Sequence, residues 1–210
     1  MLIAQPMQFE KVRKFILNKL NKELPKHLTY HSVGHIKDVF QAAENLAMME
    51  KVEGEDLTLL LTAVLFHDSG FLRSPQDHER HGCDIVKEHL PAYGYTPEQI
   101  ERICGMIMAT KIPQTPHNKL EKIICDADLD YLGRDDFPVI GDKLYDELCM
   151  YGIISTPQDW FRLQVQFLTS HHYFTRSAVK LRKAKKGEHL KRIRSIIKNK
   201  ASNWDTQMHP

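Results

Sequence analysis

The stretch LLLTAVLFHDSG, residues 59–70, decides the fold class. Its first eight residues are apolar apart from one threonine. A helix that is apolar on every side is normally buried in the centre of a protein. His67 and Asp68 follow at once, and Ser69 and Gly70 then favour the end of a helix. The sequence therefore predicts a central buried helix that ends where two chemically active side chains begin.

Amphipathic segments lie on both sides of this helix. Apolar residues recur at steps of three and four, which is the period of a helix with one buried face. The segments run over residues 9–20, 32–47, 78–90, 96–110, 120–132, 144–151, 160–168 and 176–198. Residues with the two-residue alternation of a strand do not form a sustained run. We therefore predict an all-α fold, a single-domain irregular helical bundle over residues 1–210, with core motifs in 30–133 and C-terminal helices in 136–200.

Length and charge limit the classes of protein to consider. A chain of 210 residues is the size of one globular domain. A net charge of +2 is too small for a general attraction to nucleic acid or membranes. The basic run from Arg182 to Arg194 is interpreted as a solvated helix face, and an adaptor that binds nucleic acid through it is the less favoured alternative. No apolar run of membrane-spanning length and no signal peptide are found, which favours a cytoplasmic protein.

Two histidines and two aspartates form the most informative set of polar residues. They are His35, the adjacent pair His67 and Asp68, and Asp126, and each lies beside an apolar stretch that must pack inward. Convergence in the core would bring together nitrogen and oxygen donors that suit manganese, cobalt, iron, nickel or zinc, with magnesium a less natural choice. A divalent metal ion held in this way lowers the pKa of bound water and polarises a phosphoryl oxygen. The set therefore predicts hydrolysis.

The order of these residues resembles the defining pattern of the HD superfamily of metal-dependent phosphohydrolases. Residues 30–39, 67–70 and 125–133 resemble its three motifs. In the third motif the first aspartate is the metal ligand, so we assign this role to Asp126. The resemblance implies an HD-type bundle around one or two metals. It also implies hydrolysis of a phosphomonoester or phosphodiester, in a nucleotide or another small phosphorylated metabolite.

Two residues are candidates for the chemical step. Asp68 can orient the attacking water in addition to binding metal. His31 lies four residues before His35, where cyclic-nucleotide phosphodiesterases of the superfamily have a similar histidine that protonates the leaving oxygen. The alternative for His31 is a structural role at the start of a helix.

Three further residues are assigned weaker roles near the substrate or the ligands. His78 resembles an additional metal ligand of binuclear members, but the later histidine of those members is absent from residues 106–111. This departure favours one metal, with His78 and Lys111 near the substrate phosphate. Asp128 is expected to orient the metal ligands through hydrogen bonds. Solvent-exposed or structural roles are the alternative for all three.

A second class of function fits the same residues. A regulatory module could keep an HD-type pocket and bind a nucleotide without hydrolysing it. The complete ligand set favours an enzyme, with a small phosphorylated molecule as its partner and no membrane attachment. The sequence determines neither the exact substrate nor the oligomeric state.

Overall fold

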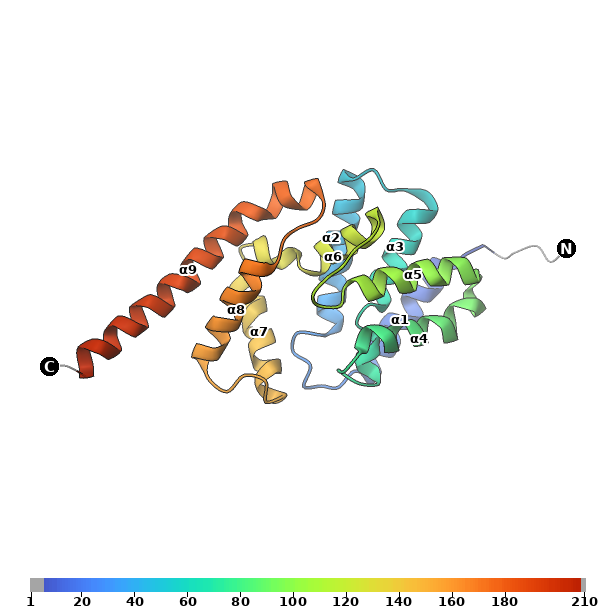
Figure 1. The fold of residues 1–210 in the computed structure, drawn as a ribbon. Coiled ribbons are helices and arrows are strands. Elements are labelled where there is room, and N and C mark those ends of the chain that lie inside the picture. Colours follow the sequence, from blue (N-terminus) through green and yellow to red (C-terminus); the bar gives the residue numbers. More distant parts are fainter. Residues whose placement is uncertain (1–5, 209–210) are drawn as a thin grey trace. The chain divides into compact units, whose positions relative to one another are not determined.

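The computed structural model describes residues 6–208, and side chains up to residue 199. These residues form helices and loops without a strand, which confirms the all-α prediction (Figure 1). The α-helices are α1 (Phe9–Glu23), α2 (Val33–Met49), α3 (Gly54–Phe66), α4 (His78–His89), α5 (Pro97–Ala109), α6 (Lys119–Asp128), α7 (Phe137–Met150), α8 (Pro157–Ser170) and α9 (Arg176–Met208). Three short 3₁₀ helices are η1 (Ser69–Leu72), η2 (Leu90–Tyr93) and η3 (Asp130–Gly133).

The chain divides into two compact units, and the division falls between Leu129 and Asp130. The first unit contains α1 to α6 with η1 and η2, and the second contains η3 and α7 to α9. This boundary lies inside the third motif, residues 125–133. All of the motif residues up to Asp128 therefore lie in the first unit. One domain over residues 1–210 stays a prediction.

Helix α3 forms the core of the first unit. Every residue from Leu59 to Phe66 is buried, as the apolar run predicts. Helices α1, α2 and α5 pack on it, and α6 contacts both α3 and α2. Burial of an apolar side chain stabilises the fold by about 1.5–3 kcal/mol, so α3 fixes its own C-terminal end firmly. That end carries His67 and Asp68.

Local sequence signals set the starts of two helices near this core. The Ser32 hydroxyl accepts a hydrogen bond from the His35 backbone N–H at 3.4 Å, which caps α2. Thr96 and Gln99 form a capping box at the start of α5, with N–O distances of 3.2 and 2.9 Å. The cap on α2 fixes the first turn of the helix, where His35 lies.

Glycine 70 allows η1 to lie directly against the start of α4. A Cβ atom built on Gly70 would lie 1.8 Å from the carbonyl oxygen of His78 and 2.8 Å from its Cα. The neighbouring atoms belong to the backbone, so no rotation of a side chain could make room. The absence of a Cβ atom therefore lets the segment after Asp68 approach His78.

A buried carboxylate, Asp130, connects the start of the second unit to its last helix, α9. Asp130 is 4% exposed, and Arg182 donates to its two oxygens from Nε at 2.6 Å and from Nη2 at 3.0 Å. A guanidinium that binds both oxygens of a carboxylate has a fixed orientation as well as a strong hydrogen bond. The backbone of Arg182 also lies against Gly133. These contacts fasten α9 to η3.

None of the described helices is both long enough and apolar enough to cross a lipid bilayer.

Candidate metal centre

Four side chains from three helical regions meet in the first unit. His35 lies in the first turn of α2, His67 and Asp68 follow α3, and Asp128 is the last residue of α6. His35 Nε2 lies 3.2 Å from Asp128 Oδ1 and 3.5 Å from Asp68 Oδ2. His67 Nε2 lies 3.5 Å and 3.3 Å from the same two oxygens. The two imidazoles and the two carboxylates thus alternate around one small volume.

The donor atoms of this cluster suit a divalent metal. One ligand atom each of His35, His67 and Asp128 lie within 4.8 Å of one another. The Nδ1 of His67 lies 2.8 Å from the carbonyl oxygen of Val64, and donation of its proton there leaves a lone pair on Nε2. His67 Nε2 and Asp68 Oδ2 are buried and lie 3.3 Å apart, and neither has a hydrogen-bond partner of good geometry. Buried polar atoms are normally paired, so these two atoms have the chemistry of metal ligands.

The third motif contains two aspartates, Asp126 and Asp128, and only their geometry in the fold distinguishes them. The structure brings Asp128, and not Asp126, to the two imidazoles. Both aspartates belong to α6, where side chains two residues apart point about 200° apart. Asp126 is completely buried, but it is not part of the ligand group. Asp128, which was expected to orient the ligands, therefore lies where a metal ligand is needed, and the assignment of Asp126 stays a prediction.

The cluster strongly perturbs the pKa values of its members. Burial alone would raise the pKa of Asp128, but hydrogen bonds from His35 and His67 and their positive charges outweigh it and lower the pKa to about 2. Asp68 is affected in the same way, mainly by the charge of His67, and its pKa falls far below the usual range. Burial would lower the pKa of His67, yet the charges of Asp68 and Asp128 raise it well above 6.5. The metal-free cluster is thus a set of carboxylates neutralised by protonated imidazole.

These pKa shifts predict that metal affinity rises with pH. Because its pKa is raised, His67 carries a proton near neutral pH that metal binding must displace. Affinity should therefore increase about tenfold per pH unit while His67 is protonated. In the metal-free protein this proton stabilises the fold fully below the unfolded pKa of about 6.5, and the stabilisation is lost as pH rises through the folded pKa. Calorimetric titration of Mn²⁺ in two buffers of different ionisation enthalpy counts the released protons.

A pH-independent affinity between about pH 6 and 8, without proton release, would contradict this account of His67. The melting temperature of the metal-free protein provides a separate check, since it should decline over the same upward change in pH.

Three rings lie beside the cluster. His31 stacks on Phe71 with 4.2 Å between ring centroids, and Phe71 lies 4.3 Å from the ring of His78. His78 Nε2 is 3.6 Å from Asp68 Oδ1 and 3.5 Å from Glu79 Oε1. The structure thus places His31 and His78 on one phenylalanine next to Asp68.

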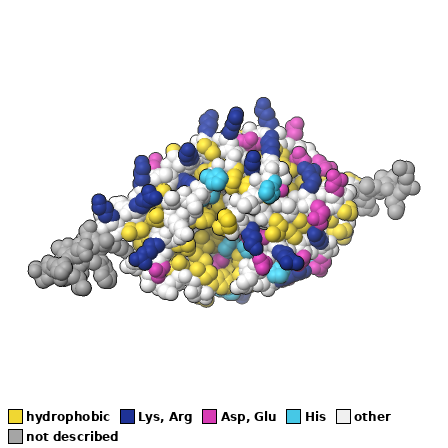
Figure 2. All heavy atoms as spheres, in the orientation of Figure 1, with side chains coloured by type: hydrophobic (Ala, Val, Ile, Leu, Met, Phe, Trp, Pro, Cys, Tyr) yellow, Lys and Arg dark blue, Asp and Glu magenta, His cyan; other side chains and the backbone are white. Residues whose placement is uncertain are grey.

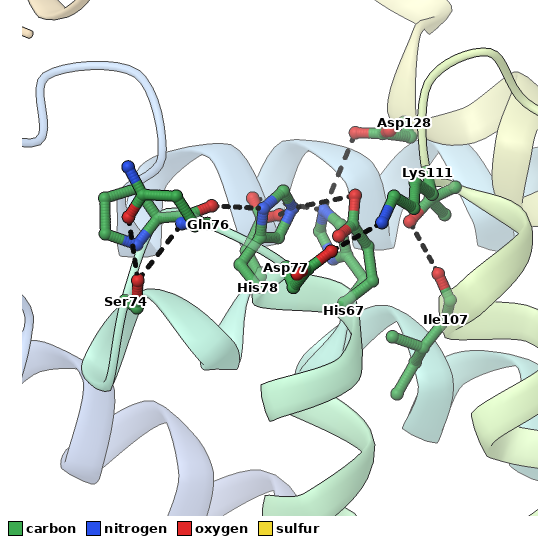
Figure 3. Close-up of polar contacts among 12 residues, drawn as sticks. His67, Ser74, Gln76, Asp77, His78, Ile107, Lys111 and Asp128 are labelled. Atoms are coloured by element: carbon green, nitrogen blue, oxygen red, sulfur yellow. Dashed lines mark hydrogen bonds and ion pairs between the residues drawn. The ribbon is translucent and has the colours of Figure 1, made fainter.

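Lys111 lies at the periphery of this region. Its Nζ atom forms an exposed ion pair of 2.6 Å with Asp77 Oδ1 (Figure 3). Asp77 immediately precedes α4, so Lys111 connects the end of α5 to the segment that carries His78. The expected contact of Lys111 with a substrate phosphate stays a prediction.

Sequence reasoning gave no role to Phe71 or Glu79. Phe71 is 6% exposed and orders two histidines, but an isolated phenylalanine in a loop carries no signal of such a role. Glu79 is also 6% exposed, and its only signal was its position directly after His78. Its carboxylate lies 3.5 Å from His78 Nε2 and helps to hold that ring in place.

Comparisons with known proteins agree with this arrangement. The family model of the HD domain matches residues 32–130. A predicted HD superfamily hydrolase from an uncultured Thermotogales bacterium has a similar structure, with a TM-score of 0.56 and 20% sequence identity over 91% of this chain and 92% of that one. A protein from Lactobacillus plantarum superposes with a TM-score of 0.67 and 17% identity over 97% of this chain and 100% of that one. At such identities the two structures show a shared fold. The search of curated proteins found no significant match.

Proposed function

Because the chain belongs to the HD superfamily through residues 32–130, we propose that it is a phosphohydrolase that uses a divalent metal. Its ligands are His35, His67, Asp68 and Asp128. The substrate is a phosphomonoester or phosphodiester in a nucleotide or another small phosphorylated metabolite. The observation that supports this proposal most strongly is the buried cluster in which two carboxylates each lie within 3.5 Å of both imidazole Nε2 atoms.

The bound metal would supply a water of lowered pKa and a positive charge for the phosphoryl oxygens. The chain supplies the remaining functions. Asp68 directs one oxygen toward the imidazoles and the other toward His78, so its carboxylate has a fixed orientation from which to accept a hydrogen bond from the attacking water and orient it. His31 rests on Phe71 beside the cluster, in a position suited to protonate the departing oxygen.

A panel of metals and substrates tests the proposal. Protein stripped with a chelator is supplied with manganese, cobalt, nickel, iron, zinc or magnesium. It is then assayed on nucleoside mono-, di- and triphosphates, cyclic nucleotides and p-nitrophenyl phosphoesters. We expect product only after a metal is restored, and no product from an Asp68→Asn variant that retains its helical circular dichroism. That variant also excludes a contaminating hydrolase.

Saturable nucleotide binding without product, for every metal, would contradict the proposal and favour the regulatory module. Equal turnover by the wild type and Asp68→Asn would contradict the assigned role of Asp68.

A further inference from the structure

Helix α9 of the second unit is strongly basic. Between residues 176 and 198 it has ten lysines and arginines, and Glu188 is the single acidic residue. Figure 2 shows Lys and Arg side chains following the course of this helix on the visible face. Some of these cations bind other groups inside the second unit, whereas others are exposed.

Basic side chains on one side of α9 bind within the second unit. Arg182 forms the ion pair with Asp130, and Lys185 Nζ lies 2.6 Å from Asp135 Oδ1. Lys186 Nζ donates to the backbone carbonyl of His171. Six exposed cations lie in a row on another side of the helix. They are Arg176, Lys180, Lys183, Lys191, Arg194 and Lys198, and we call them the basic stripe. Arg192 is also exposed but lies outside this row, and Arg194 additionally donates from Nη2 to Thr169 Oγ1 at 3.2 Å.

The spacing of the basic stripe places its members in one row. Their separations are four, three, eight, three and four residues. At 100° per residue, all six side chains fall within a strip about 80° wide. Like charges three or four residues apart repel by about 0.2–0.5 kcal/mol per pair. Among the described residues, Lys180, Lys183 and Lys191 make no ion pair that would offset this repulsion. The stripe therefore has an unfavourable self-energy that a polyanion would relieve.

Other features of α9 identify the kind of polyanion. Binding into a lipid surface needs an open apolar face, whereas Ala178 and Ile193 of α9 are buried within its unit. Val179 and Leu181 are exposed, but they are two residues apart and point about 160° apart, so they form no shared apolar face. Proteins that bind single-stranded nucleic acid commonly stack bases on aromatic side chains, and the stripe has none. From residue 176 to 198 the stripe extends about 33 Å, close to one turn of a nucleic-acid duplex at about 34–36 Å.

We propose that the basic stripe binds the phosphate backbone of duplex nucleic acid without sequence preference. This interaction is separate from the metal centre, which lies in the first unit. It revises the expectation from the sequence, where the basic run was interpreted as a solvated face. The reason is that the structure places six exposed cations in one row along the helix.

Fluorescence anisotropy with labelled 20-base-pair DNA and RNA duplexes of mixed sequence tests the stripe in the full-length chain. We expect a Kd of about 10⁻⁴–10⁻⁶ M at physiological salt, and a slope of log K against log salt near −5 if all six cations contact phosphates. The triple variant Lys180→Glu, Lys183→Glu, Lys191→Glu should weaken binding at least about tenfold and reduce the slope to about half. Circular dichroism confirms that α9 remains helical.

A control variant with the same net charge shows whether the position of the charges matters or only their total. Lys14→Glu, Lys22→Glu, Lys26→Glu alters three exposed lysines of the first unit and should keep the affinity within about threefold. Equal loss in both variants would overturn the proposal. So would tighter binding to single strands than to duplexes, or binding to vesicles containing phosphatidylserine without duplex binding. Metal-dependent hydrolysis should be unchanged in both variants, so failure of this proposal leaves the proposed function intact.

Discussion

Asp128→Asn is expected to abolish metal binding and hydrolysis together, although the side chain keeps its size. Asp128 Oδ1 lies 3.2 and 3.5 Å from the two imidazole nitrogens, and the amide would lose the negative charge that neutralises a divalent ion there. Loss of a group that only orients ligands costs about 10–100-fold in metal affinity, so loss of a ligand should cost at least about 100-fold. Metal content after dialysis and turnover on the best substrate of the panel measure both effects.

Asp126→Asn is the matched control, since it makes the same change two residues earlier in α6. Asp126 is buried, so this variant is expected to lower the melting temperature. It should nevertheless bind one metal per chain at close to the affinity of the wild type. The reverse result, with metal lost from Asp126→Asn and kept by Asp128→Asn, would restore the assignment made from the sequence.

The two aspartates show how far sequence alone can position a ligand. The apolar run over residues 59–66 is sufficient to predict a buried helix, because no other location satisfies all of its faces. It also fixes His67 and Asp68 at the end of that helix. Choosing between Asp126 and Asp128 depends instead on the rotation of α6 about its axis. Packing on α2 and α3 sets that rotation, and both contacts are distant in sequence.

Other features were unpredictable for a similar reason. The role of Phe71 depends on His31 and His78, which reach it from two other parts of the chain. The separation of the chain after Leu129 depends on the density of long-range contacts, while the helical pattern continues through the boundary. Local periodicity therefore predicted the helices and their caps, whereas tertiary contacts determine which side chains meet.

Gly70→Ala is expected to reduce both stability and turnover strongly. The added methyl group would lie 1.8 Å from the carbonyl oxygen of His78, so η1 and the start of α4 must move apart. Overpacking of this kind costs about 1–3 kcal/mol, and here backbone atoms have to shift. Asp68 lies just before η1 and His78 begins α4, so the same movement disturbs the cluster. A misplacement of about 1 Å can reduce turnover about 100-fold.

Gly34→Ala provides a control for this prediction, because it lies next to His35 in the same unit. Its new Cβ atom would be 3.4 Å from the Ser32 hydroxyl, an ordinary contact, and Gly34 is exposed. We expect unchanged or slightly higher stability there, since alanine favours a helix over glycine by about 0.5–1 kcal/mol. Chemical denaturation and metal-dependent turnover are measured for both variants. If Gly70→Ala matched Gly34→Ala in both measurements, the backbone approach between η1 and α4 could not be what positions His78 beside Asp68.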